Sequence, residues 1–471
     1  MKKNIFKLFM LVFASVFLFS ACSDDDNKVD TKEPVKKPLS FKIAVASDTH
    51  FFDPSLIVND GKAFQDFLNT DRKLLAESNA ILDNMFDQII EKKPELLIIP
   101  GDLTKDGEKV SHLNFAQKLD RVKEAGIKVL VIPGNHDINN PNAHEFDGDN
   151  SSAVDHISPR EFMEIYKEFG YDAEAQIEKG PKLSYLFEPL EGLWVIGIDA
   201  CIYENNIEEN YPRTGGKLDE EHVAWIVEKI TEGRAQGKEV IAMMHHGLVE
   251  HFPKQGEIAS DYIIPNYNTI APRFAEAGLQ FIFTGHSHAQ DISSLTVGDK
   301  DIYDIQTGSS ITYPCPFRMV NITEDLFCIK SHDILLNSEI TNNKELREFA
   351  FDDINESIFG IINVALNSGG DSSSPINQMI GPAAEVLMTM DPSILQPFAT
   401  EIYTNMCGGD EKGVLSSFID PDTNEKVLTY DYAKAMLEHT SESFKQIFPL
   451  TDLITKDSGP SDNDFKVLLK K

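Results

Sequence analysis

Basic residues are scarce in this chain of 471 amino acids. It holds 43 lysines and arginines against 76 aspartates and glutamates, which gives a formal net charge of −33. A surface this acidic repels nucleic acids and anionic lipids, which argues against a nucleic-acid duplex or a charged membrane as the partner. An anionic substrate would meet the same repulsion, so a site for one must supply positive charge locally.

Cysteine is also rare, with five residues in the chain. None of them stands in a Cys-x-x-Cys spacing, which argues against a zinc knuckle. An oxidising compartment would permit disulfides among Cys201, Cys315, Cys328 and Cys407. The sequence does not decide which of them form.

Long apolar runs are missing except near the N-terminus. There, three lysines precede the run from Leu8 to Phe19, which is too short to span a bilayer comfortably and is typical of a signal peptide over residues 1–21. Ser20 and Ala21 lead into Cys22, and this resembles the bacterial lipoprotein box. The following SDDD resembles the acidic export signal of surface-exposed lipoproteins in the Bacteroides group. We therefore expect lipid on Cys22 and a surface-exposed outer-membrane location, with the lipid as the only membrane contact. The alternative is a plain secretory peptide with an incidental cysteine.

The rest of the chain is long enough for two or more domains. Residues 22–40 are charged, contain proline and are poor in apolar residues, so they are expected to form a flexible tether. Strand patterns dominate residues 41–335. After residue 335 helical patterns take over, at 346–366, 376–388, 392–406 and 430–448, and predict an all-helical C-terminal domain over 336–471. The alternative is that these helices merely cover the first sheet.

One unit recurs from residue 41 to about residue 330. A short apolar run, the length of a buried strand, ends abruptly in a polar motif. The runs are FKIAVASDTH, ELLIIPGDLTKDG, KVLVIPGNHDINN, WVIGIDA, EVIAMMHHGL and LQFIFTGHSH. Helical patterns lie between them at 71–93, 110–125, 158–170, where Ser158 and Glu161 form a capping box, and after Asp219. This alternation predicts an α/β fold, in which ligands bind beyond the carboxyl ends of the strands.

The polar motifs supply a set of metal-ligand side chains. Carboxylate, imidazole and amide oxygen together suit zinc, manganese or iron better than calcium or magnesium. Seven ligands are too many for one tetrahedral ion and about right for two ions that share a carboxylate. Residues two apart in an extended strand end point the same way, which would bring together the pairs at 48/50 and 286/288. The candidates are Asp48, His50, Asp102, Asn135, His245, His286 and His288.

The ordered set DxH, GD, GNHD, H and GHxH resembles the calcineurin-like metallophosphoesterases. The resemblance covers residues 41 to about 330, and it implies a sandwich of two central sheets flanked by helices, with a dinuclear metal centre at the sheet ends. The stretches SDTHFFDP, GDLTKDGEKVSH and PGNHDINNP, together with the helical C-terminal region, resemble class III cyclic-nucleotide phosphodiesterases of the Listeria type.

The resemblance also implies a role for each ligand. Asp48, His50 and His288 would hold the first metal, and Asn135, His245 and His286 would hold the second. Asp102 would bridge the two ions. His245 is preferred over His246 because the family ligand is the first residue after the apolar run.

Three further residues near the motifs are candidates for substrate binding or catalysis: His136, Asp137 and His246. His136 would contact the substrate, stabilising the phosphoryl oxygens or protonating the leaving oxygen, and Asp137 would orient His136. The alternative for Asp137 is a helix N-cap. His246 lines the substrate pocket or is structural. His112, His251 and Arg213 lie in loops that could reach the substrate, but we expect them to be surface residues rather than substrate contacts.

The resemblance implies hydrolysis of phosphodiesters, with 3′,5′-cyclic nucleotides as the expected substrates. The attacking group would be hydroxide formed from water at two ions of manganese, iron or zinc. The ions would also answer the charge problem, because they make the pocket locally cationic. One alternative is a broad phosphomonoesterase or nucleotidase that scavenges phosphate at the cell surface. A non-catalytic surface binding protein is the other. The oligomeric state is left open.

Overall fold

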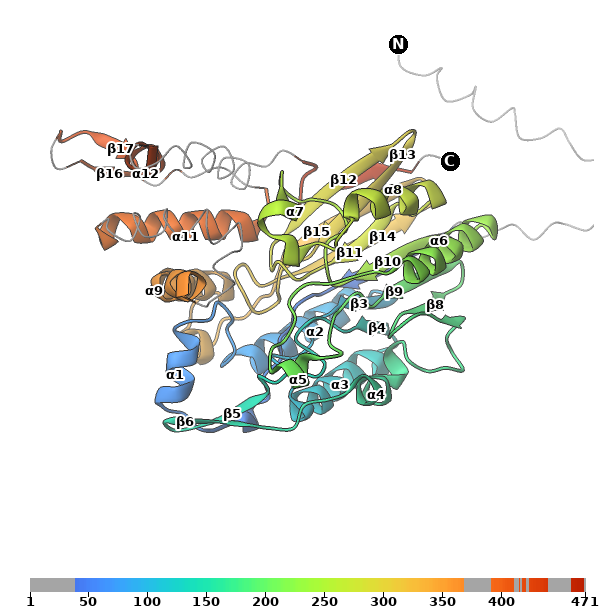
Figure 1. Cartoon of the computed structure of the whole chain (residues 1–471), viewed down its shortest axis with the longest axis horizontal. Helices are drawn as coiled ribbons and strands as arrows, with labels where there is room; N and C mark the ends of the chain where they lie inside the picture. The colour runs from blue at the N-terminus through green and yellow to red at the C-terminus, as the bar shows by residue number, and fades with distance from the viewer. Residues whose placement is uncertain are drawn as a thin grey trace, which may run out of the picture. The chain divides into compact units, whose positions relative to one another are not determined.

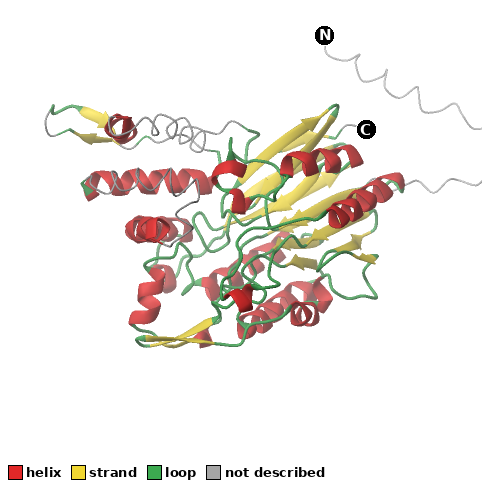
Figure 2. Ribbon diagram, viewed as in Figure 1, coloured by secondary structure: helices red, strands yellow, loops and turns green. Residues whose placement is uncertain are grey.

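The strands of this computed structural model gather mainly into two large sheets (Figures 1 and 2). The structure describes residues 39–367, 391–410, 415, 417–420, 423–438 and 459–469. The strands in this part are β1 (Ser40–Val45), β2 (Ile57–Asn59), β3 (Leu96–Pro100), β4 (Lys128–Ile132), β5 (His144–Asp147), β6 (Asn150–Ala153), β7 (Glu178–Lys179), β8 (Tyr185–Leu190), β9 (Leu193–Ile198), β10 (Glu239–Met244), β11 (Phe281–Thr284), β12 (Asp291–Val297), β13 (Lys300–Gln306), β14 (Pro316–Thr323), β15 (Leu326–Asp333), β16 (Ser417–Ile419), β17 (Lys426–Leu428) and β18 (Lys466–Leu468).

The helices surround these sheets. They are α1 (Lys62–Leu68), α2 (Ser78–Lys92), α3 (Lys109–Glu124), α4 (Pro159–Ile165), α5 (Asn206–Glu209), α6 (Glu220–Ala235), α7 (Gln255–Ile258), α8 (Tyr267–Ala277), α9 (Leu346–Asn367), α11 (Pro392–Gly408) and α12 (Thr429–Glu438). Within the described ranges, four short 3-10 turns, η1 to η4, occupy Pro54–Leu56, Lys167–Phe169, Ser260–Tyr262 and Glu339–Thr341.

The first sheet has the strand order β18-β15-β14-β1-β3-β4. Its members β1, β3 and β4 are parallel neighbours. Their carboxyl ends therefore lie at one edge, and each leads directly into a predicted polar motif. β14 runs antiparallel to β1, and β15 and β18 continue the antiparallel part.

The second sheet has the order β12-β13-β11-β10-β9-β8-β7, with β9, β10, β11 and β13 parallel. Its side chains alternate between two cores, as the period of two of a strand requires. Ile241, Met243 and Phe283 belong to the core shared with the first sheet. Val240 and Ala242 belong to the core on the opposite face, under α6 and α8.

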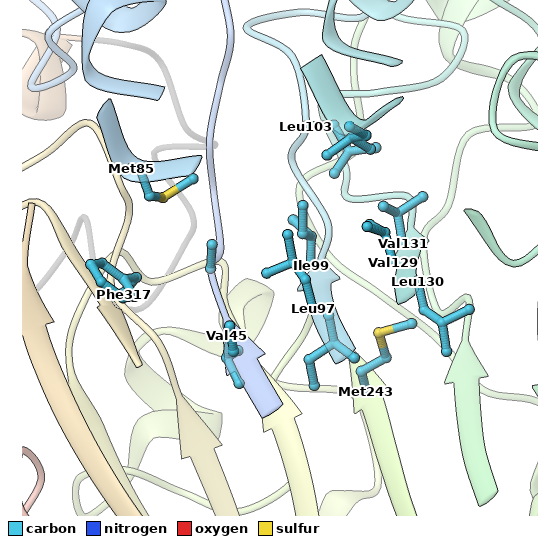
Figure 3. Close-up of a cluster of buried hydrophobic side chains, with 14 of the residues drawn as sticks. Val45, Met85, Leu97, Ile99, Leu103, Val129, Leu130, Val131, Met243 and Phe317 are labelled. Carbon is cyan, nitrogen blue, oxygen red and sulfur yellow. The ribbon is translucent and has the colours of Figure 1, made fainter. Parts of the chain in front are cut away.

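The core between the sheets is built from both of them (Figure 3). Leu97 and Ile99 of β3 and Val131 of β4 lie in the same cluster as Met243 of β10. All four side chains are fully buried, and each contributes about 1.5–3 kcal/mol to folding by that burial. Helices α2 and α3 pack on the same cluster through residues such as Met85. The predicted α/β fold of two sheets flanked by helices is confirmed.

Most predicted helices are found within a few residues of their expected bounds. The capping box of Ser158 and Glu161 opens α4, and Asp219 caps α6 by accepting a hydrogen bond from the main chain of His222. The helix expected from residue 71 begins only at Ser78 as α2. The preceding segment is a loop, because the amide of Leu74 donates to the carbonyl of Ile311. This hydrogen bond attaches the segment to the loop between β13 and β14.

The described part of residues 336–471 contains helices but is not all-helical. α9, α11 and α12 overlap three of the four predicted helical stretches, and the stretch 376–388 is outside the described residues. β16 and β17 form a hairpin, and β18 pairs with β15 at the edge of the first sheet. The expectation of a purely helical region is wrong, because its last residues complete a sheet. The domain boundary at 335/336 stays a prediction.

Two further predictions concern the ends and the cysteines. The signal peptide, the lipidation of Cys22 and the start of the tether lie outside the described residues. Among the described residues, none of the helices has the length and apolar character needed to cross a bilayer. Cys201, Cys315 and Cys328 are not in disulfide bonds.

Candidate metal centre

Five of the seven predicted ligands have a left-handed main chain. The φ angles are 48° at Asp48, 36° at His50, 49° at Asp102, 71° at His286 and 59° at His288. This conformation is uncommon for residues other than glycine, and it concentrates at functional sites. Because β1 ends at Val45 and β11 at Thr284, the two ligand pairs lie in turns beyond the strands. The argument from an extended strand end is therefore wrong, although the residues do converge.

The first group of ligand atoms comes from Asp48, His50, Asp102 and His288, all buried and all with one ligand atom within 4.8 Å of the others. Nε2 of His50 lies 2.9 Å from Nε2 of His288 and 3.5 Å from Oδ2 of Asp102. Nε2 of His288 lies 3.5 Å from Oδ1 of Asp48. Both histidines therefore present Nε2 to the carboxylates.

The second group shares Asp102 and adds His245 and His286, again with ligand atoms within 4.8 Å. Nε2 of His245 lies 3.3 Å from Oδ2 of Asp102. It is also 3.0 Å from Oδ1 of Asn135, which brings the seventh predicted ligand into the group. Asp102 thus stands between the two groups, as a bridging ligand must.

Main-chain carbonyls fix which nitrogen these two histidines offer. Nδ1 of His245 lies 2.9 Å from the carbonyl of Pro100, so Nε2 is the nitrogen that faces the group. Nε2 of His286 lies 3.1 Å from the carbonyl of Asp261, so Nδ1 is the nitrogen left for a metal. Hydrogen bonds of this kind set the tautomer and the ring orientation of metal-binding histidines.

The pKa shifts of the clustered side chains are consistent with the binding of divalent cations. Burial raises the pKa of Asp48 to about 6, because a carboxylate removed from water is costly to ionise. Burial lowers the pKa of His50 and His288 well below the ordinary value, so both are neutral, the form that binds metal. Against the effect of burial, His245 and His136 hold the pKa of Asp102 well below its usual range.

His245 carries the positive charge that answers Asp102. Although burial acts in the opposite direction, Asp102 raises the pKa of His245 to about 9. A metal ion bound by His245 must displace that proton, which makes metal affinity depend on pH. Carboxylate, imidazole and amide donors around one shared carboxylate form the ligand set that a dinuclear site requires.

Two glycines let the ligand loops approach each other. A Cβ on Gly134 would overlap the side chain of Asp102, and a Cβ on Gly285 would overlap Oγ of Ser47 and Oδ2 of Asp48. The glycine before the ligand in GNHD and in GHSH therefore leaves the space that the carboxylate of the facing loop occupies.

His136 lies beside the cluster and is its most open histidine, with 29% of its side chain exposed. Its main-chain N–H donates to Oδ1 of Asp102 at 2.9 Å, and its Nε2 is 4.0 Å from Oδ2 of the same residue. Its Nδ1 is 2.8 Å from Oδ1 of Asp106. Against the effect of burial, these two carboxylates raise the pKa of His136. The ring is thus fixed at Nδ1 and free to act at Nε2.

The prediction that Asp137 orients His136 is wrong, because its carboxylate is used elsewhere. Its oxygens accept main-chain N–H groups of Leu103 at 3.1 Å, Thr104 at 3.0 Å and Gly134 at 2.8 Å. Residues 135–139 form a turn and a bend, and no helix follows, so Asp137 is not a helix cap either. It joins the loop after β3 to the loop after β4, and burial raises its pKa to about 7.

Asp106 is the site residue that the sequence did not reveal. Lys105 forms a buried ion pair with its other oxygen, and Asn140 donates to its Oδ1 at 3.3 Å and to the carbonyl of His136 at 3.0 Å. Asp106 stands four residues after Asp102 in GDLTKDG, and that spacing was the only available signal.

Four other predicted residues take different places. His246 is fully buried, its Nε2 is 3.0 Å from the carbonyl of Thr214, and its ring lies 4.6 Å from that of His286. It supports His286 in this structure and is not open to a substrate. His112 is buried against Tyr166, and the side chain of His251 is also buried, so the expected surface position is wrong for both. Arg213 is exposed beside Glu209, as expected.

Comparisons with known proteins give one family match. A family model described as calcineurin-like phosphoesterase matches residues 41–290, which contain all seven predicted ligands. A dimetal phosphatase from Danio rerio is 14% identical, with a TM-score of 0.44, and covers 64% of this chain and 98% of that chain. The protein TT1561 of Thermus thermophilus is 9% identical, with a TM-score of 0.33, and covers 63% of this chain and 100% of that chain. At these scores neither structure carries an argument about this chain. No curated protein matches it significantly.

Proposed function

The chain belongs to the calcineurin-like phosphoesterase family, and on this premise we propose that it hydrolyses phosphodiesters, with 3′,5′-cyclic nucleotides as the first substrates to test. The observation that carries the proposal is the pair of buried ligand groups that share Asp102. We propose manganese, iron or zinc as the ions, since imidazole and carboxylate ligands suit these metals.

Two ions bound there would act as Lewis acids on the phosphoryl oxygens and lower the pKa of a water molecule. The protein holds the carboxylates of Asp48 and Asp102 in place for this through main-chain donors. The amide of His286 donates to both oxygens of Asp48 at 3.0 Å, and the amide of His136 donates to Asp102. Side chains held in this way do not have to reorganise when the substrate arrives.

His136 is the residue best placed to serve the leaving group. It is part-exposed, and its Nδ1 is held by Asp106, so the proton on Nε2 points away from that carboxylate. Because Asp102 and Asp106 raise the pKa of His136, the ring holds a proton that it can give to a leaving oxygen. Departure of an alkoxide from a diester requires such a proton.

The preference for diesters is supported by the local sequence. Asp106 belongs to GDLTKDGEKVSH, and Asn140 belongs to PGNHDINNP, the two stretches that resemble cyclic-nucleotide phosphodiesterases. Both residues act on His136 in the structure. The resemblance therefore includes residues that hold the proposed proton donor, as well as the metal ligands common to the whole family.

The test compares three substrates on one preparation reloaded with manganese: cyclic AMP, bis-p-nitrophenyl phosphate and p-nitrophenyl phosphate. We expect turnover of the two diesters, and loss of cyclic AMP hydrolysis in His136→Ala with metal content unchanged. Fast hydrolysis of the monoester with negligible hydrolysis of either diester would contradict the proposal and favour a phosphomonoesterase or nucleotidase. Protein that binds no metal and hydrolyses none of the three would favour a binding protein.

For location, we propose a lipoprotein anchored through Cys22. The support is the run of small residues before this cysteine and the acidic stretch after it. Mass spectrometry of the N-terminal peptide from membranes should show a lipid-modified Cys22. A chain cleaved elsewhere and released as soluble protein would contradict this proposal.

A further inference from the structure

Asp304 is a fully buried carboxylate in the middle of β13, outside every polar motif of the sequence. It lies opposite Ile282 of β11 and Ser293 of β12 in the second sheet. A buried carboxylate is costly unless hydrogen bonds or a cation compensate it. Its contacts therefore show what the carboxylate is used for.

These contacts reach the two loops that carry His245 and His286. Oδ2 accepts the main-chain N–H of Leu248 at 2.6 Å and of Val249 at 3.0 Å, just beyond His245. Oδ1 accepts the hydroxyl of Thr284 at 2.5 Å, two residues before His286. One carboxylate thus joins both histidine loops of the second sheet.

A histidine on the loop after β10 adds a second link to the end of the His286 loop, where β12 begins. Nε2 of His251 lies 3.5 Å from Oδ2 of Asp304, and its Nδ1 lies 3.2 Å from Oδ2 of Asp291. Asp291 is three residues after His288. Against the effect of burial, Asp291 and Asp304 raise the pKa of His251 to about 10, so its charge compensates the two carboxylates.

The contacts are unequal between the two metal groups. Asp304 itself holds the loops of His245 and His286, both ligands of the second group, whereas only His288 of the first group lies on one of these loops. The loop of Asp48 and His50 is held by different residues: the hydroxyl of Ser309 donates to the carbonyl of Asp48 at 2.7 Å. A change at Asp304 should therefore act on one metal more than on the other.

We propose that Asp304 is a positioning residue for the second metal ion, which it serves by fixing the separation of His245 and His286. The proposal rests on the proposed function, since it assumes that both ligand groups bind ions. Asparagine at this position has the shape of aspartate, but its NH2 group replaces one of the two acceptor oxygens. This NH2 group would face N–H or O–H donors with which it cannot form a hydrogen bond. The two loops then lose their common acceptor.

The experiment measures manganese binding to the full chain after chelator treatment, by titration and by electron paramagnetic resonance. Wild-type protein should bind two ions and show the signal of a coupled manganese pair. Asp304→Asn should keep the first ion and bind the second about 10-fold to 100-fold more weakly, with the pair signal reduced at equal manganese. The matched control is Asp199→Asn, because Asp199 is equally buried and also accepts main-chain N–H groups, of Leu183 and Cys201, but accepts none from a loop that carries a metal ligand.

Each outcome decides the matter. Two ions bound by Asp304→Asn as tightly as by wild type would overturn the inference and leave the proposed function intact. Equal weakening of both ions, or equal weakening in Asp199→Asn, would overturn it as well. If Asp304→Asn does not fold, Thr284→Val removes one contact and should still weaken the second ion alone. Wild-type protein that binds no manganese would overturn the proposed function together with this inference.

Discussion

Oδ1 of Asp106 lies 2.8 Å from Nδ1 of His136, and this pair stands next to Asp102, the residue that the two ligand groups share. The candidate metal ligands and the proposed proton donor are therefore different residues. The two ligand groups consist of buried histidines and carboxylates, whereas His136 is part-exposed and its Nδ1 contacts Asp106. Substitutions can therefore test metal binding and proton transfer separately.

Asp106→Asn should lower kcat for a diester by about 100-fold while metal content stays at the wild-type level. The reason is that Asp106 raises the pKa of His136 and orients its ring. Steady-state kinetics with cyclic AMP, whose leaving group is an alkoxide, together with elemental analysis, would measure both. Asp53→Asn is the matched control, because Asp53 is another buried aspartate, on a neighbouring loop, that caps η1. A kcat of wild-type size in Asp106→Asn would exclude this role.

Gly285→Ala should weaken metal binding and cost about 1–3 kcal/mol of stability. The added Cβ would overlap Ser47 and Asp48, so the ligand loop of His286 must move away from the loop of Asp48. Gly408→Ala is the control, since its Cβ would meet only ordinary contacts at 3.8 and 3.9 Å. Urea unfolding and manganese titration would show the difference. Equal behaviour of the two variants would contradict the close approach.

His251 should stabilise the fold in a manner that depends on pH. Its pKa is raised to about 10 by Asp291 and Asp304, so its contribution is full below the ordinary histidine pKa of about 6.5 and is lost as the pH rises through about 10. His251→Gln should cost on the order of 3 kcal/mol at pH 6, and less at pH 10. Urea unfolding of both proteins at pH 6, 8 and 10 would measure this. A difference that stays constant with pH would show that the charge on His251 contributes nothing.

The end of the chain should be essential to folding. Phe465 is 6% exposed, and its ring packs against Tyr303 and Phe327 in the core between the sheets. Phe465→Ala should cost about 3–5 kcal/mol. Leu468→Ala, in the adjoining β18, should cost under about 0.5 kcal/mol because Leu468 is 75% exposed. Thermal unfolding of both variants would test this, and equal small losses would show that the tail is only loosely attached.

Because the C-terminal residues pack on the first sheet, a deletion of this region would affect folding as well as substrate preference. Arg318 is fully buried and donates to the carbonyls of Gln306, at 2.7 Å, and of Asp462. Deletion of residues 340–471 would strip β18 from the sheet and leave Arg318 without Asp462. We therefore expect the deleted protein not to fold, so single substitutions are better tests of substrate preference than removal of the whole region.

The seven ligands could be found from the sequence because each follows a run of apolar residues, and parallel strands bring their carboxyl ends together. The reason given for the pairs at 48/50 and 286/288 was nevertheless wrong. Left-handed φ angles at these residues, rather than strand geometry, turn the side chains inward. A pattern of apolar and polar residues carries no information on φ at a single position.

Residues that act through long-range contacts could not be found in this way. Asp106 meets His136 across 30 positions of sequence, and Asp304 meets Leu248 across 56. Asp304 looks like one polar residue in an ordinary strand, and β18 is too short to stand out from a loop. Their partners are set by how the sheets and loops pack, which periodicity alone does not specify.

The most direct test of the account is the number of manganese ions per chain in wild-type protein and in Asp102→Asn, measured by elemental analysis after reloading and desalting. Because Asp102 is the one residue common to both ligand groups of the described structure, wild-type protein should hold two ions, and Asp102→Asn should hold fewer than one with its fold intact by circular dichroism. A single ion in wild-type protein, or two ions retained by Asp102→Asn, would contradict a dinuclear centre bridged by this carboxylate.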